Sequence, residues 1–252
     1  AAIASFGRLG RASVASADRH AAGSSTSSGN CGVSGTITTT LNDNDNSSSV
    51  SVGDSATIVY NACHDSATSS VSGTISVTIT SVSGNSFSAT ANVQNVQATD
   101  QGLSSTVNGQ FTLSDDETDT QDDETLAIGS GGLTVSVQCT SYTDTLTFAS
   151  GMHIETVYDS VSGDTRLSLN GGLSSSKLAG SLTLTTVQPV VQHATDAYPS
   201  SGQVRAVGAN GSALLMTVLN TTQVQLQLDA DGNGSYEASS TANWSTLIGQ
   251  QG

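Results

Sequence analysis

Apolar and polar residues alternate with a period of two along most of the chain from Cys31 onward. Clear examples are residues 73–80, 133–137, 181–185 and 223–228. Such alternation is typical of half-buried β-strands, whose successive side chains point to opposite faces of a sheet. Clusters of Gly, Asn, Asp and Ser separate the runs and favour turns. We therefore predict an all-β protein, an antiparallel meander that forms a sandwich or a strongly coiled sheet, with an extended N-terminal tail.

A short repeat punctuates the predicted strands. It has the form Val/Leu-Ser/Asn-Gly and places glycines at Gly35, Gly73, Gly109 and Gly171. A glycine at such a point permits a turn or a β-bulge. We interpret the repeat as a set of related hairpins, with a turn or bulge where each strand begins.

Two prolines divide the chain. Pro189 and Pro199 are the only prolines, and both lie between positions 187 and 202. Proline removes a donor from a sheet ladder, so this stretch is the best candidate boundary. We predict a basic tail over residues 1–30, a main β domain over 31–188 and a C-terminal β subdomain over 189–252 packed on it.

Charge changes the picture of the chain as a whole. The 252 residues hold 6 Lys+Arg against 21 Asp+Glu, a formal net charge of −15. A nucleic-acid partner is therefore excluded, because such binding needs clustered cations. No apolar run approaches the length of a transmembrane helix. Residues 1–30 carry a net charge of +2, from three Arg and one Asp, and the remainder carries −17.

The N-terminal segment therefore differs from the body in charge. It combines cations with a few apolar residues and ends in a Ser/Gly-rich linker, so docking on an anionic body is expected. The alternatives are the body of the same chain and the body of a neighbouring copy. The residues that we expect to make this contact are Ile3, Phe6, Arg8, Leu9, Arg11, Val14 and Arg19. Because the chain starts at Ala1, we expect a protein exported after cleavage of a signal peptide.

Three cysteines fit an exported protein better than a cytosolic one. Cys31 opens the first predicted strand and Cys63 closes the second, so an antiparallel hairpin brings them together. We predict a Cys31–Cys63 disulfide, with Cys139 free and buried. The alternative is a Cys63–Cys139 bridge.

Residues 43–54, DNDNSSSVSVGD, resemble a twelve-residue calcium loop. Oxygen ligands fall at alternating positions, as such loops require. The predicted ligands are Asp43, Asp45, Ser47, Ser49 and Asp54. Ser48 stands where glycine is usual and Asp54 where glutamate is usual. The alternative is a polar hairpin loop without metal.

Residues 229–237, DADGNGSYE, match the pattern D-x-D-x-N-G-x-x-E more closely. Gly234 occupies the position of the sharp turn. The predicted calcium ligands are Asp229, Asp231, Asn233, Ser235 and Glu237. The run follows a predicted strand, so the alternative is a tight hairpin turn that needs no metal.

Residues 115–124 hold seven acids in ten positions. A run of like charges is typical of a solvated loop. The functional alternatives are a weak cation site and a docking surface for a basic segment. The sequence contains neither of the hydrolase motifs H-E-x-x-H and G-x-S-x-G. We therefore predict no catalytic residues and no enzymatic activity.

Two stretches carry a family resemblance. The first is residues 41–63 (LNDNDNSSSVSVGDSATIVYNAC), and the second is residues 201–247, which contain a D-x-D-G-N-G turn and a late Trp. Both stretches resemble segments of a group of uncharacterised, exported, Ser/Thr-rich β proteins of proteobacteria. Many members are lipoproteins, whereas the first cysteine here is at position 31. The resemblance implies export and a β fold, and it implies no activity.

These observations lead to two hypotheses. The first is a structural subunit of an extracellular filament or surface layer. It would assemble head-to-tail with copies of itself through the N-terminal segment, by strand addition to a sheet edge, and calcium would stabilise its loops. The second is a calcium-dependent surface adhesin or carbohydrate-binding module with glycan partners.

Overall fold

The computed structural model describes residues 23–178, 180–208 and 210–247. They form fifteen β-strands and one helical turn. The elements are β1 (Ser24–Asn30), β2 (Ser34–Asn42), β3 (Ser55–His64), β4 (Ser69–Ser83), β5 (Ser86–Asp100), β6 (Leu103–Glu117), β7 (Gln121–Cys139), β8 (Tyr142–Phe148), β9 (His153–Asp159), β10 (Thr165–Ser175), β11 (Ser181–Gln192), β12 (Ser201–Gly208), β13 (Ala213–Asn220), β14 (Gln223–Asp229), β15 (Ala238–Asn243) and α2 (Trp244–Leu247).

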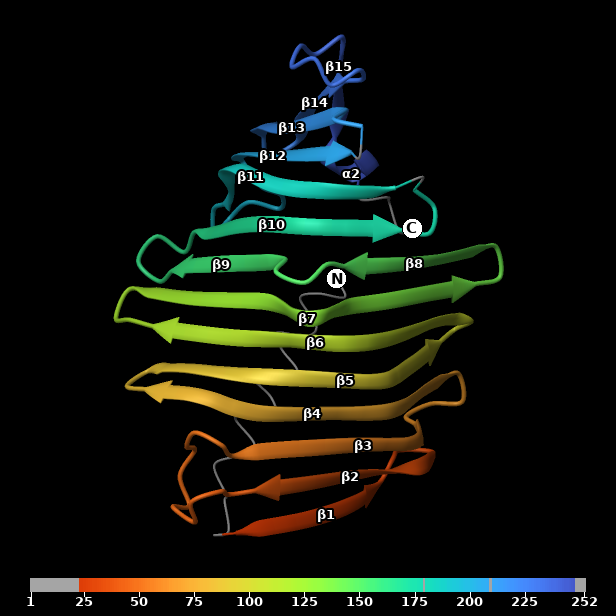
Figure 1. The fold of residues 1–252 in the computed structure, drawn as a ribbon, viewed down its shortest axis with the longest axis vertical. Helices are drawn as coiled ribbons and strands as arrows, with labels where there is room; N and C mark the ends of the chain where they lie inside the picture. The colour runs from red at the N-terminus through yellow and green to blue at the C-terminus, as the bar shows by residue number, and fades with distance from the viewer. Residues whose placement is uncertain (1–22, 179, 209, 248–252) are drawn as a thin grey trace.

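All fifteen strands belong to one antiparallel sheet, and their spatial order follows the chain (Figure 1). The predicted all-β antiparallel meander is confirmed, and it takes the form of a single sheet. β1 and β15 lie at opposite ends of the long axis, and neither pairs with a second strand among the described residues. The domain boundary that we predicted at residue 189 falls inside β11, and the sheet continues across it. Residues 24–30, which we predicted to be the end of a tail and linker, form the strand β1 because they pair with β2.

β8 and β9 lie end to end and together take up a single strand position in the sheet. Residues 133–139 of β7 pair with β8, and residues 121–127 of the same strand pair with β9. On the other side, β10 pairs with β9 through its first half and with β8 through its last residues. The two strands are therefore one long strand interrupted at residues 149–152. The fifteen strands therefore occupy fourteen strand positions across the sheet, which we call rungs.

The repeated glycines bend the strands. Gly73 (φ 119°) and Gly109 (φ 138°) lie at register shifts in the ladder. A Cβ atom at Gly73 would lie 2.4 Å from the Asn95 carbonyl oxygen, and one at Gly109 would lie 2.3 Å from that of Gly132. No other residue fits such an approach. The predicted bulges are present at Gly73 and Gly109, but they lie within strands rather than at strand starts. Gly171 also lies within a strand, and the irregularity of that strand falls before it, between Leu167 and Asn170.

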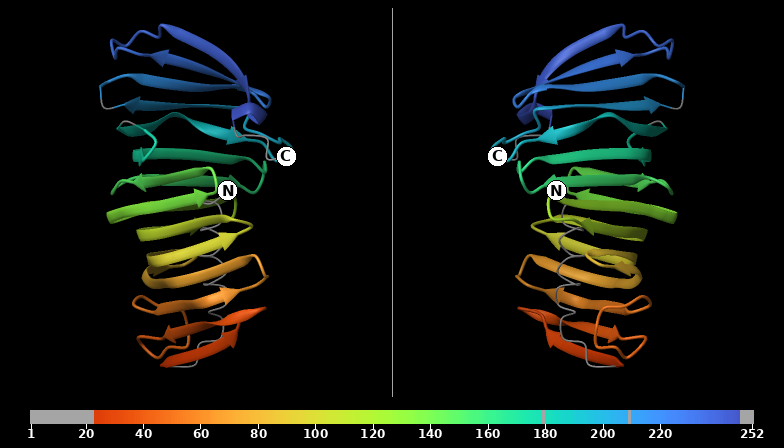
Figure 2. Two further views of the ribbon diagram at one scale, coloured as in Figure 1. Left: turned by 90° about the vertical axis from the view of Figure 1, so that its right-hand side faces the viewer. Right: turned by 90° about the vertical axis from the view of Figure 1, so that its left-hand side faces the viewer.

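The main hydrophobic core fills the inside of this bend. Val107 and Phe111 flank Gly109 on β6, and both belong to one cluster of buried residues. The other members are Ala91, Val93, Ile128, Leu133, Phe148 and Met152. Side chains from both sides of the kink therefore pack together, which lets a single sheet exclude water from one face. Figure 2 shows the sheet in profile as one curved layer.

A second, smaller core lies near the C-terminal end. Val190, Val218, Val224 and Trp244 are buried together there. The indole Nε1 donates a hydrogen bond of 3.2 Å to the Pro199 carbonyl oxygen, and the ring stacks on Tyr198 at 6.3 Å between centroids. The late tryptophan thus ties α2 to the β11–β12 connection.

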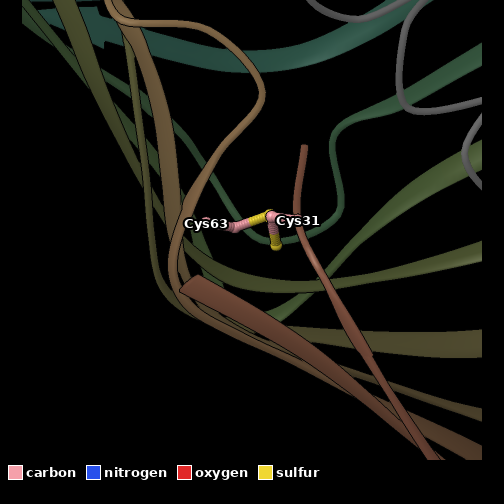
Figure 3. Close-up of a disulfide and its surroundings, with 2 residues drawn as sticks. All are labelled: Cys31 and Cys63. Carbon is pink, nitrogen blue, oxygen red and sulfur yellow. A yellow bond between two sulfur atoms is a disulfide. The ribbon is translucent and has the colours of Figure 1, made fainter. Parts of the chain in front are cut away.

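The predicted Cys31–Cys63 disulfide is confirmed, with a Cα–Cα distance of 5.4 Å. It links the β1–β2 turn to the end of β3, beside the place where the strand ribbons bend (Figure 3). Cys139 is free, as predicted, but it is only partly buried because it is the last residue of β7 before a turn. A disulfide of this kind indicates a non-reducing environment.

Candidate metal-binding loops

Two acidic loops lie near opposite ends of the sheet. The first joins β2 to β3 and contains residues 43–54, and the second joins β14 to β15 and begins at Asp229. In each loop, three carboxylates place oxygen atoms within 4.8 Å of one another. They are Asp43, Asp45 and Asp54 in the first loop and Asp229, Asp231 and Glu237 in the second. The structure therefore brings together the acidic residues of both predicted sites.

Asp43 organises the first loop from inside. Its side chain is 3 % exposed, and its two carboxylate oxygens accept hydrogen bonds from the amides of Ser47 (3.2 Å) and Ser48 (2.9 Å). Asp45 accepts a second bond from the Ser47 amide at 2.9 Å. The pKa of Asp45 is lowered, chiefly by hydrogen bonds from Ser47, so this carboxylate stays ionised below its usual range.

Asp54 closes the first loop. It is 2 % exposed and accepts hydrogen bonds from the Asn44 amide (2.9 Å), the Ser51 amide (2.8 Å) and the Ser51 hydroxyl (3.2 Å). The backbone of Asp54 also pairs with Ile79 of β4, at 2.8 Å. The end of the loop is therefore fixed to the body of the sheet.

In the second loop, Asp229 occupies the position that Asp43 occupies in the first. It is 2 % exposed, and it accepts hydrogen bonds from the amides of Gly232 (2.8 Å), Asn233 (3.1 Å) and Gly234 (2.9 Å). Asp231 accepts from the Asn233 amide at 3.1 Å. Glu237 closes the loop by accepting from the Ala230 amide at 2.8 Å.

The two loops share one hydrogen-bonding scheme. In each, the first acid accepts from the amides four and five residues later, the second acid accepts from the amide two residues later, and the closing acid accepts from the amide that follows the first acid. The fourth and sixth positions have positive φ in both: Asn46 (56°) and Ser48 (61°), then Gly232 (75°) and Gly234 (88°). Ser48 thus adopts the conformation that glycine usually supplies.

The remaining predicted ligands belong to the loop framework. Ser47 donates its hydroxyl hydrogen to the Ser49 carbonyl oxygen at 2.9 Å. Asn233 accepts from the Ser235 amide at 2.7 Å. Three carboxylates so close together repel one another, and each cluster could hold a metal ion that would offset this repulsion.

The acidic run of residues 115–124 is a hairpin between β6 and β7 rather than a loop. Cross-strand pairing sets Asp115 opposite Glu124, Asp116 opposite Asp123, and Glu117 opposite Asp122. Like charges directly opposite one another destabilise a sheet. The alternation of β6 places Asp115 and Glu117 on the same face as the core residues Phe111 and Leu113. This face of the sheet therefore changes from apolar to strongly acidic along the strand.

Sequence reasoning missed a further buried carboxylate. Asp144 of β8 is 7 % exposed and accepts hydrogen bonds from the hydroxyls of Ser175 and Ser176, each at 2.8 Å, and from Tyr142 at 3.0 Å. These bonds, led by the one from Ser175, lower the pKa of Asp144 to about 2. No local signal reveals this cluster, because Ser175 and Ser176 lie 31 and 32 positions from Asp144 along the chain.

The predicted assembly residues, from Ile3 to Arg19, lie outside the described residues. Comparisons of the chain with family models, with curated proteins and with solved structures found no match. The resemblance to exported proteobacterial β proteins therefore stays a prediction. Within the described ranges, no helix has the length and hydropathy that a membrane crossing requires.

Proposed function

We propose that this protein is a non-enzymatic structural subunit of an extracellular filament or surface layer, built head-to-tail from copies of the same chain. The observation that carries the proposal is the open sheet, which ends in two edge strands at opposite ends of the molecule. An edge strand offers unpaired N–H and C=O groups, which are a template for another strand.

The composition of both edges favours pairing. β1 reads SSTSSGN and β15 reads ASSTAN, and both are almost wholly exposed. Monomeric proteins protect such edges with charged residues, prolines or bulges. Neither strand contains a charged residue or a proline. Edges of this kind suit a protein whose sheet is continued by a partner.

The N-terminal segment has a complementary surface on the body. Its three arginines give residues 1–30 a net positive charge, and the hairpin of residues 115–124 presents its acids beside the apolar core face. A segment with both cations and apolar residues matches such a face. We propose that this segment strengthens the contact between neighbouring subunits.

Calcium is the cation that we propose for the two acidic loops. Carboxylate and carbonyl oxygens are its preferred ligands, and its flexible coordination suits loops of unequal length. Bound calcium would hold the β2–β3 and β14–β15 turns rigid. The β14–β15 turn leads into the edge strand β15, and the β2–β3 turn follows β2, which pairs with the edge strand β1.

Electron microscopy of the purified full chain, with calcium and with EDTA, tests the proposal. We expect filaments or sheets in calcium. The triple variant R8S/R11S/R19S should assemble less, whereas the control R205S, in β12, should assemble normally. A chain that stays monomeric at every concentration tested would overturn the proposal. Monomers that bind glycans only with calcium would instead support the adhesin hypothesis.

A further inference from the structure

We infer that β15 of one subunit pairs antiparallel with β1 of the next, so that successive copies form one uninterrupted sheet. The inference rests on the proposed function and names the partner surface: a second copy of this chain, bound edge to edge. It is carried by the direction, length and chemistry of the two edge strands.

Direction comes from the number of rungs. Neighbouring rungs are antiparallel throughout, and the fifteen strands fill fourteen rungs because β8 and β9 share one. In an even set of alternating rungs, the first and the last run in opposite directions. A copy moved along the stacking axis therefore brings its β1 antiparallel to β15 of the copy before it, with no reversal of the molecule. An odd number of rungs would have made this junction parallel.

Length and position agree with this pairing. β1 has seven residues and β15 has six, so the two can pair along almost their whole length. They lie at opposite ends of the long axis, so a chain cannot satisfy one edge with its own other edge (Figure 1). Fourteen rungs spaced about 4.8 Å apart would give a subunit repeat of about 67 Å, and any sheet twist would make the operation a screw.

Side-chain chemistry can continue across the junction. Hydroxyls of β1 already pair across strands with β2, at 3.1 Å between Thr26 and Thr40 and at 3.0 Å between Ser28 and Thr38. On β15, Ser239 accepts a hydrogen bond from Gln225 of β14 at 3.2 Å. Ser and Thr fill five of the seven positions of β1 and three of the six positions of β15, so each junction would join two edges rich in small polar side chains.

A heterologous contact of this kind does not close on itself and yields filaments. Pairing of like edges, β1 with β1 or β15 with β15, would need a two-fold axis instead. The two arrangements differ in which residues of neighbouring copies meet, and this difference can be measured.

Site-specific cross-linking of the full chain tests the inference. In a C139S background, which leaves no free thiol apart from the introduced one, S27C and S240C variants are mixed under assembly conditions and treated with a short bismaleimide. We expect cross-linked dimers in the mixture and none with either variant alone. The double variant S27C/S240C should give a ladder of higher oligomers on a denaturing gel. A238C or A242C should cross-link in place of S240C if the register differs by two residues, which is the smallest shift that keeps the same face of both copies on one side of the sheet.

A charge exchange gives a second measurement. The variant S27K/S240K sets lysines against each other at every junction and should lose assembly, whereas S27K/S240D should regain it. Filaments that cross-link β1 to β1, or that assemble normally as S27K/S240K, would overturn the edge pairing while the proposed function stands. A chain that forms no assembly at all would overturn both.

Discussion

The two acidic loops adopt the same backbone arrangement with different residues. Both wrap backbone amides around a buried aspartate, and both place two residues in the left-handed region. The second loop uses glycines there and closes with an exposed glutamate, whereas the first uses Asn46 and Ser48 and closes with the buried Asp54. The comparison teaches that a glycine-based motif can be reproduced without glycine when buried carboxylates hold the backbone in place.

The two loops should differ most in the loss of stability that follows removal of their closing acids. D54A leaves the amides of Asn44 and Ser51 without their acceptor in a partly buried place, so we expect the free energy of unfolding to fall by about 3 kcal/mol. E237A removes one hydrogen bond at the surface and should cost about 1 kcal/mol or less. Urea titration of both variants measures the difference, and D54N, which keeps one acceptor oxygen, should lie between D54A and the wild type. Equal losses for D54A and E237A would contradict the structural distinction between the loops.

Calcium should stabilise both loops by mass action. A ligand that binds only the folded state at a hundred times its Kd adds about 2.7 kcal/mol to the free energy of unfolding. We therefore expect the Tm to rise with calcium, and D45A and D231A each to remove part of that rise. The double variant D45A/D231A should show none, and D100A, whose carboxylate lies outside both loops, serves as the control. A rise that survives in the double variant would place the cation elsewhere.

Much of the fold follows from local pattern. Alternation predicts the strands, the hairpin between Cys31 and Cys63 predicts the disulfide, and the spacing of acids predicts both loops, because each of these depends on residues close together along the chain. The single layer could not be predicted in this way. It depends on kinks at Gly73 and Gly109, whose partners lie across the ladder and whose effect is to gather the core inside the bend.

The Asp144 cluster and the acidic hairpin were beyond sequence reasoning for the same reason. Hydroxyls that neutralise the cost of burying Asp144 come from the end of β10, which the interruption between β8 and β9 brings next to β8. The acids of residues 115–124 looked like a solvated loop because like charges seldom face one another in a sheet.

Exchange of the residues at the sixth position should have opposite effects in the two loops. The left-handed region costs a non-glycine residue about 1–2 kcal/mol, so S48G should release strain, partly offset by the greater freedom of glycine in the unfolded chain. We expect a net gain of about 0.5–1 kcal/mol. G234A should cost about 1 kcal/mol through backbone strain alone, because no atom lies within 4 Å of the added Cβ. Chemical denaturation measures both changes, and a loss of stability in S48G would show that the serine side chain has a role that its backbone conformation does not explain.

The smallest effect should be the acid sensitivity of a carboxylate that lies in neither loop. Asp144 is held by hydroxyls rather than by loop amides, and its pKa is lowered from 3.8 to about 2. A lowered pKa in the folded state means that the contribution to stability is complete above the unfolded value and is lost as the pH falls from about 4 towards 2. In thermal unfolding over this range, D144N should therefore show a flatter decline of Tm than the wild type, and S175A/S176A should resemble D144N. If the decline of Tm in D144N equals that of the wild type, the acid sensitivity arises from the loop carboxylates instead of Asp144. The hydrogen bonds from Ser175 and Ser176 would then not give Asp144 a greater acid sensitivity than the loop carboxylates have.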